Sequence, residues 1–314
     1  MGRGQGPARA VIAAGALLLG GASVPVDLPI REARWLQSSD PASDLTHQPR
    51  ECRSAASNPH VRQLEDIGRV AFRAPLLLGG QAAKVGLSCS SCHRNGRTNA
   101  HFHFPGLSGP PGTADVTSSL MSSHRGDGIF NPKPIPDLAG EPAKLKVSRD
   151  PQKGDLRNFI FGLITQEFDG PPPPRAVLDG LAAYVRSLSP AACKGAQTTD
   201  VKLDEMLDDV DSAVRLAKQA YAVRDRPAGR LLIAAARSTL GAIDERFQLA
   251  GGEQSRGELR KADAELRTIE TTFQPSPGTF SPWYAHWSER KRALRSKEEQ
   301  SYFSEAVVRR ALGN

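Results

Sequence analysis

The stretch Leu87-Ser88-Cys89-Ser90-Ser91-Cys92-His93 places two thiols and an imidazole next to one another in the chain. Its Cys-x-x-Cys-His spacing is typical of covalent heme attachment in c-type cytochromes. One short helical turn brings both sulfur atoms to one edge of a porphyrin and places the next side chain beneath the metal. We therefore expect Cys89 and Cys92 to bind one heme c covalently and His93 to be the proximal iron ligand.

Two other kinds of site also use a Cys-x-x-Cys pair. A structural zinc site normally needs a second pair of Cys or His ligands, whereas Cys52 and Cys193 are single and distant in the sequence. A redox-active dithiol of the thioredoxin type lies near a βαβ pattern, which this sequence lacks. The sequence thus favours heme attachment over both alternatives.

The N-terminus has the three parts of a secretory signal peptide, which we assign to residues 1–22. Arg3 and Arg9 precede an apolar segment at residues 11–24, and the small residues 20–22 suit a cleavage site. The apolar segment is short for a membrane span. We therefore expect a periplasmic or exported protein with no membrane span after cleavage; the alternative is an uncleaved membrane anchor.

Export also permits disulfide bonds. Cys52 and Cys193 are the cysteines that remain outside the Cys-x-x-Cys pair, and they flank the expected heme region. We expect them to form a disulfide. The alternative is two free thiols.

Composition limits the class of protein and its partners. The chain has 314 residues, of which 39% are hydrophobic, and 24 prolines and 29 glycines require many loops. The formal net charge is +7, without a long run of like charge or a nucleic-acid-binding motif. We expect no nucleic-acid partner. A mildly basic surface suits an acidic redox partner protein or aids solubility, and we favour the second role.

The hydrophobic pattern predicts a mainly α fold. Together with the Cys-x-x-Cys-His motif, it leads us to expect a cytochrome c-like heme domain with long loops, followed by an antiparallel helical bundle. An irregular N-terminal arm at residues 23–54 precedes the heme domain, which spans residues 55–195. In that domain we expect a helix that Asn58 caps and that ends near Pro75, a loop to residue 88, a loop-rich segment at 94–155, and helices at 156–168 and 176–188.

Residues 200–314 form the expected bundle. Amphipathic repeats predict helices at 201–222, 227–248, 254–272 and 282–312, the last of them continuous or broken. Trp283, Tyr284 and Trp287 lie close together on the last helix, where we expect core packing rather than a partner-binding patch. The bundle is our candidate for partner docking or for a homodimer.

Two segments carry a family resemblance. Residues 64–72, followed by residues 86–93, resemble the bacterial cytochrome c peroxidase and methylamine-utilisation family, in which a helix precedes a loop and Ser-Cys-x-x-Cys-His. Residues 181–188 resemble the C-terminal helix of cytochrome c domains, which in those folds crosses the N-terminal helix, here residues 61–73. The resemblance covers about residues 60–190. Family members usually carry two hemes, whereas this chain has one Cys-x-x-Cys-His, so the resemblance implies the fold more than the peroxidase activity.

The sixth iron ligand, on the face of the heme opposite His93, distinguishes an electron carrier from an enzyme. A methionine there suits electron transfer, whereas an open position allows a substrate to react at the iron. Met121 is the one methionine between the signal peptide and residue 200. His124, His101 and His103 compete with it, and an open position is the remaining alternative.

Glu167 is a further candidate near the end of the 156–168 helix. A carboxylate in a heme pocket acts as an acid–base group toward peroxide. The alternative is a solvated charge at a helix end.

The sequence leads to one main functional hypothesis and two alternatives. The main one is an exported monoheme c-type cytochrome that transfers single electrons to and from a redox partner protein. The first alternative is a peroxidase-like heme enzyme with an open distal site that reduces peroxide. The second is a non-redox heme sensor or assembly protein. The sequence identifies no catalytic residue.

Overall fold

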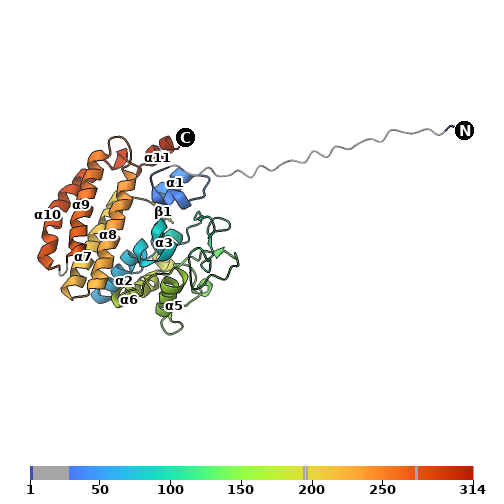
Figure 1. Ribbon diagram of the computed structural model, residues 1–314, viewed down its shortest axis with the longest axis horizontal. Helices are drawn as coiled ribbons and strands as arrows, with labels where there is room; N and C mark the ends of the chain where they lie inside the picture. The colour runs from blue at the N-terminus through green and yellow to red at the C-terminus, as the bar shows by residue number, and fades with distance from the viewer. Residues whose placement is uncertain (3–27, 194, 196, 273–274, 314) are drawn as a thin grey trace.

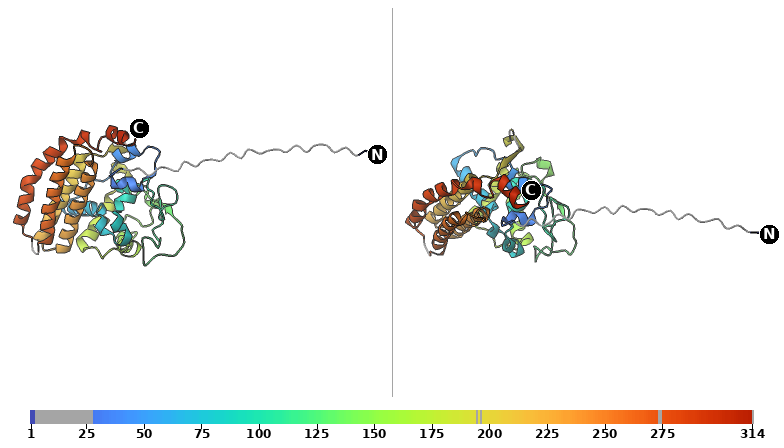
Figure 2. Two further views of the ribbon diagram at one scale, coloured as in Figure 1. Left: turned by 45° about the horizontal axis from the view of Figure 1, so that its top comes forward. Right: turned by 90° about the horizontal axis from the view of Figure 1, so that it is seen from above.

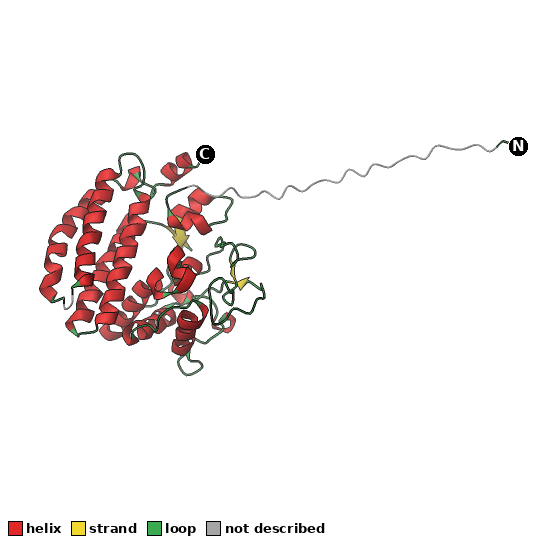
Figure 3. Ribbon diagram, in the orientation of Figure 1, coloured by secondary structure: helices red, strands yellow, loops and turns green. Residues whose placement is uncertain are grey.

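The computed structural model describes residues 1–2, 28–193, 195, 197–272 and 275–313. Almost all of the expected signal peptide falls at residues 3–27 and lies outside the described residues. The protein is mainly helical, as predicted, with very little sheet (Figures 1 and 3). Within the described ranges, no helix combines the length and the apolar character needed to cross a membrane.

The helices of the expected heme domain fall close to their predicted positions. They are α2 (Pro59–Phe72), α4 (Cys89–Cys92), α5 (Leu156–Gly162) and α6 (Arg175–Ser187); an additional helix, α3 (Gly80–Val85), lies between α2 and α4. Asn58 caps α2 as predicted, because its side chain accepts a hydrogen bond from the Val61 amide at 3.0 Å. The predicted 156–168 helix is α5 continued by a π-helical turn over Leu163–Glu167.

Helices α2 and α6 cross at a pair of glycines, Gly68 and Gly180. A Cβ atom on Gly68 would lie 2.0 Å from the Gly180 carbonyl oxygen, so the two backbones touch. Next to the crossing, Phe72 and Tyr184 pack edge to face with ring centroids 5.2 Å apart. The crossing positions the segment that follows α2, and this segment leads to α4.

The prediction of a plain loop at residues 75–88 was wrong, because α3 forms there. The Gly79 amide donates to the Phe168 carbonyl at 3.0 Å, and Ala82 is fully buried. Gly86 ends the helix with a φ of 81°, in the left-handed region that glycine adopts readily. A helix this short is stabilised mainly by its packing, so its sequence carries little periodic signal.

The bundle contains four long helices: α7 (Leu203–Ala222), α8 (Arg226–Arg246), α9 (Glu253–Thr271) and α10 (Ser281–Arg295). They lie side by side, and short connections reverse the chain direction between α7 and α8 and between α8 and α9 (Figures 1 and 2). Trp283 and Trp287 are buried and stacked with centroids 4.9 Å apart, which confirms core packing for both residues.

The predicted 282–312 helix is broken. After α10 the chain turns through residues 296–304 and forms α11 (Glu305–Ala311). The Tyr302 amide donates to the Arg246 carbonyl at 2.9 Å, which holds the turn against α8. Helix α11 then packs on α1 (Pro41–Thr46), where Val308 and Leu45 are buried in one small apolar cluster.

The N-terminal arm is less irregular than predicted. Besides α1 it contains β1 (His47–Pro49), which pairs antiparallel with β4 (Thr198–Asp200). Such a pairing between distant segments leaves no local sequence signal. The loop-rich segment 94–155 matches the prediction more closely, with only a short ladder between β2 (Thr113–Ala114) and β3 (Lys133–Pro134).

Candidate functional site

The Cys-x-x-Cys pair forms the single helical turn α4. Ser88 precedes the turn, and its backbone amide donates to the Ser91 hydroxyl at 3.0 Å in a capping box. Cys89 and Cys92 are three positions apart, so they share one side of the turn, whereas Ser90 and Ser91 occupy the other. The His93 amide closes the turn by donating to the Cys89 carbonyl at 2.9 Å.

His93 is held by a hydrogen bond to the main chain of a distant loop. Its Nδ1 lies 3.0 Å from the Pro136 carbonyl oxygen. A carbonyl oxygen only accepts, so Nδ1 carries the proton and Nε2 is the ring nitrogen left for a metal. The Phe72 ring lies beside the imidazole with centroids 6.4 Å apart. Helix α2 and the 131–140 loop thus orient His93 together.

Cys89, Cys92 and His93 are half-buried. Burial raises the pKa of both thiols to about 12 and lowers the pKa of His93 to about 4. At neutral pH the thiols are therefore protonated and the imidazole is neutral. Reactive dithiols have lowered thiol pKa values, and burial shifts the pKa of these two thiols in the opposite direction. A neutral imidazole with a free Nε2 is the form that binds iron.

The donor set fits a covalently bound heme. Two thiols share one side of a turn, and an oriented imidazole follows them directly. A zinc site is less suitable, because among the described residues no group of three or more His, Cys, Asp or Glu side chains gathers to hold a metal ion.

Cys52 and Cys193 form a disulfide, which is the pairing expected from the sequence. It joins the end of the N-terminal arm to the segment after α6. The Cys52 side chain is fully buried. The Nη1 of Arg97 lies 3.0 Å from Cys52 Sγ and 3.7 Å from Cys193 Sγ, so a guanidinium group packs directly on the bridge.

The candidates for the distal ligand differ in their surroundings. Met121 is 1% exposed and belongs to the large core cluster against which Cys89 and Cys92 pack. His124 is largely exposed, and its Nδ1 lies 3.0 Å from Asp169 Oδ1. Met121 is therefore a buried core residue, whereas His124 lies at the surface.

His101 and His103 lie in the segment that leaves the heme turn. The Nε2 of His101 is 3.6 Å from Asp44 Oδ1, with nearly half of the side chain exposed. The His103 amide donates to the Trp35 carbonyl at 3.0 Å, which ties this residue to the N-terminal arm. Both histidines therefore border the arm.

Glu167 is a buried carboxyl group, not the solvated helix-end charge that was the alternative. It is 4% exposed, and its Oε2 has no hydrogen-bond partner among the described residues. The Nη1 of Arg125 lies 3.7 Å from its Oε1. Burial raises the pKa of Glu167 and outweighs the opposing effect of Arg125. Its position on a π-helical turn is one that functional residues often occupy.

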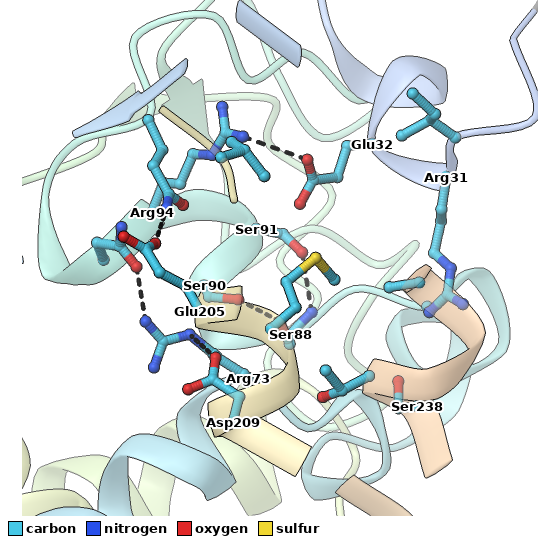
Figure 4. Close-up of a pocket in the computed structure, with 18 of the residues that line it drawn as sticks. Arg31, Glu32, Arg73, Ser88, Ser90, Ser91, Arg94, Glu205, Asp209 and Ser238 are labelled. Atoms are coloured by element: carbon cyan, nitrogen blue, oxygen red, sulfur yellow. Dashed lines mark hydrogen bonds and ion pairs between the residues drawn. The ribbon is translucent and has the colours of Figure 1, made fainter. Parts of the chain in front are cut away.

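A cavity of about 470 Å³ lies on the serine side of α4 (Figure 4). Ser88, Ser90 and Ser91 line it together with charged residues from the N-terminal arm, α2, α7 and α8, namely Arg31, Glu32, Glu51, Arg69, Arg73, Glu205, Asp209 and Glu245. Such a charged lining does not suit a porphyrin, and Cys89, Cys92 and His93 lie outside it.

The charges around this cavity pair with one another and connect the N-terminal arm, α2 and the bundle. Arg31 Nη2 is 2.9 Å from Glu245 Oε1, Arg69 Nε is 2.9 Å from Glu51 Oε2, and Arg73 Nε is 3.7 Å from Asp209 Oδ2. The ion pairs therefore hold the arm and the end of α2 against the bundle beside this cavity.

Sequence reasoning missed Pro136, which contacts His93, and Arg97, which binds the neighbouring Asp137. Pro136 and Arg97 lie in a segment rich in Gly and Pro, and their contacts join residues about 40 positions apart. No local pattern marks such contacts. The prolines around residue 136 were the one available signal, because they stiffen the loop that supplies the carbonyl.

No protein-family model, curated protein or solved structure matches this chain. Its function therefore has to follow from the chemistry of its own residues.

Proposed function

We propose that this protein is an exported c-type cytochrome that carries single electrons through one covalently attached heme. The observation that carries the proposal is the hydrogen bond from His93 Nδ1 to the Pro136 carbonyl, next to two thiols on one turn. A histidine that ligates a metal usually donates its other ring N–H to a carbonyl or carboxylate, which fixes the ring and raises its basicity.

Each residue has a defined role in this proposal. Cys89 and Cys92 form the thioether bonds, and His93 Nε2 is the proximal iron ligand. Bound heme c supplies a reversible Fe(III)/Fe(II) couple. The Phe72 ring and the Pro136 carbonyl hold the imidazole plane, and Met121 is the proposed distal ligand because it is buried and neutral.

The helix crossing supports a cytochrome c-like heme domain. The resemblance implies that the N- and C-terminal helices of such a domain cross, and α2 and α6 cross at Gly68 and Gly180. The Cys52–Cys193 disulfide supports an exported location, because such bonds persist outside the reducing cytosol. The partner that exchanges electrons would be another protein, with the bundle as the proposed docking or dimerisation surface.

Covalent heme attachment tests the proposal. The full chain is expressed in a bacterial host that has the c-type heme maturation machinery, and its intact mass is measured after denaturation. We expect the mass of one heme to stay with the chain and to be lost in Cys89→Ala/Cys92→Ala. The Cys52→Ser/Cys193→Ser variant is the matched control and should keep the heme. A wild-type chain that carries no heme after denaturation would refute the proposal.

Glu167 favours a second candidate function, the reduction of peroxide. A buried carboxyl group with a raised pKa is suited to move a proton at a heme pocket. The ferrous spectrum with carbon monoxide separates the two functions. A low-spin heme that does not bind the gas supports the carrier, whereas gas binding together with peroxide turnover that Glu167→Gln abolishes supports the enzyme.

A further inference from the structure

Arg97 connects the disulfide to the loop that supports His93. Its Nη1 contacts the sulfur atoms of Cys52 and Cys193 at 3.0 and 3.7 Å. Its Nε donates to Asp137 Oδ2 at 2.7 Å. The guanidinium group is mostly buried, with 22% of the side chain exposed, so water competes little for these contacts.

Asp137 directly follows Pro136, whose carbonyl accepts the hydrogen bond from His93. The other carboxylate oxygen of Asp137 accepts from the Ala139 amide at 2.9 Å, and its carbonyl accepts from the Gly140 amide at 2.9 Å. One side chain therefore both shapes the turn after Pro136 and binds Arg97.

A second contact runs beside the first. Thr98 Oγ1 donates to the Ile135 carbonyl at 3.0 Å. Residues 97 and 98 thus hold the loop on both sides of Pro136. The Pro136 carbonyl has little freedom to move while these contacts persist, because its two neighbours are fixed.

We propose that Arg97 is a positioning residue that ties the Pro136 carbonyl, and through it the His93 ring, to the Cys52–Cys193 disulfide. The effect of Arg97 on the hydrogen bond between His93 and Pro136 is inferred from the geometry alone and does not require heme. The effect of this hydrogen bond on an iron atom rests on the proposed function. Loss of Arg97 releases Asp137 from the disulfide, and the carbonyl then holds the Nδ1 proton less tightly.

The first experiment reads the hydrogen bond without heme. The full chain is isolated without heme and labelled with ¹⁵N-histidine, and the exchange of the His93 Nδ1 proton with water is followed by NMR, the signal being assigned by its loss in His93→Gln. We expect Arg97→Leu to speed this exchange about tenfold, the size expected for losing roughly one hydrogen bond. Arg97→Lys should change it in the same direction, because lysine lacks the fork that reaches both partners.

Arg53→Leu is the matched control. Arg53 also lies beside the disulfide and forms a half-buried pair with an aspartate, Asp66, at 3.1 Å. We expect its loss to leave the exchange of the His93 proton unchanged. A wild-type rate in both Arg97 variants, or an equal acceleration in Arg53→Leu, would overturn the proposal.

The second experiment measures the reduction potential of the heme-loaded chain. A weaker bond to Pro136 makes the imidazole less basic, which stabilises ferric iron less, so Arg97→Leu should raise the potential. The Cys52→Ser/Cys193→Ser variant should raise it too, and adding Arg97→Leu should give little further change. Fully additive shifts would contradict the coupling. A chain that takes up no heme refutes the proposed function only, because the NMR comparison still decides the role of Arg97.

Discussion

The backbone of Gly68 in α2 touches the backbone of Gly180 in α6. A Cβ atom built on Gly68 would lie 2.0 Å from the Gly180 carbonyl oxygen, well inside any real contact distance. We therefore expect Gly68→Ala to force the helices apart and to lower the free energy of unfolding by about 1–3 kcal/mol or more. Chemical denaturation of the purified chain measures this.

Gly257 in α9 is the matched control, because a Cβ atom there would meet no atom within 4 Å. Gly257→Ala should leave stability unchanged or raise it by up to about 1 kcal/mol, since alanine favours the helix. If Gly68→Ala and Gly257→Ala changed the free energy of unfolding equally, the close approach of α2 and α6 would not be the reason that position 68 needs glycine.

Glu51 should contribute to stability in a pH-dependent way. Burial alone would raise its pKa, but the guanidinium groups of Arg73 and Arg69 and the hydroxyl of Tyr184 lower it to about 2, from an ordinary value of 4.5. A lowered carboxyl pKa stabilises the folded state above the ordinary value, and this stability is lost as the pH falls toward 2. The contribution is on the order of 3 kcal/mol.

Glu51→Gln should therefore lower the unfolding free energy at pH 7 and flatten its decline as the medium is acidified. Denaturation at a series of pH values measures both effects. Glu289→Gln, at an exposed position on α10, should keep the wild-type pH profile. An unchanged profile in Glu51→Gln would contradict the role of this carboxylate.

Glu167 should have the opposite pH dependence. Burial raises the pKa of Glu167, so the folded state favours the protonated carboxyl group. The folded state is therefore destabilised as the pH rises from the ordinary pKa through the raised one. The unfolding free energy of Glu167→Gln, relative to wild type, should therefore be higher at about pH 8 than at about pH 4. If the difference in unfolding free energy between Glu167→Gln and wild type were the same at both pH values, ionisation of Glu167 would not affect stability.

Met121→Leu tests the proposed distal ligand. Leucine is close to methionine in volume, so the buried site should stay packed and stability should change by less than about 1.5 kcal/mol. The methionine-to-iron charge-transfer band of the oxidised heme should nevertheless disappear. If the band persists in Met121→Leu, another residue holds the distal position.

The helices with strong local signals were predicted well. Asn58 before Pro59 set the start of α2, and the apolar periodicity gave α6 and the first three bundle helices to within about two residues. The short helical turn at Cys89–Cys92 was also predicted from consecutive residues, whereas its binding of heme stays a prediction. These features are local, and local features are what a single sequence records most directly.

The parts that the sequence did not predict depend on contacts between distant segments. Helix α3 needs the Phe168 carbonyl, β1 needs β4, and the orientation of His93 needs Pro136. Helix α7 of the bundle docks on α2 through pairs such as Arg69 with Asp209. Neither partner in such pairs carries a pattern that identifies the other.

The disulfide closes residues 52–193 into a covalent ring, because Cys52 and Cys193 are 141 positions apart in the chain. Lys144 lies inside this ring with 77% of its side chain exposed, in a segment open to proteases. A cut after Lys144 would therefore leave residues 1–144 and 145–314 as one molecule. The piece with the heme turn and α2 would remain bonded to the piece with α6, and the two would separate only after reduction.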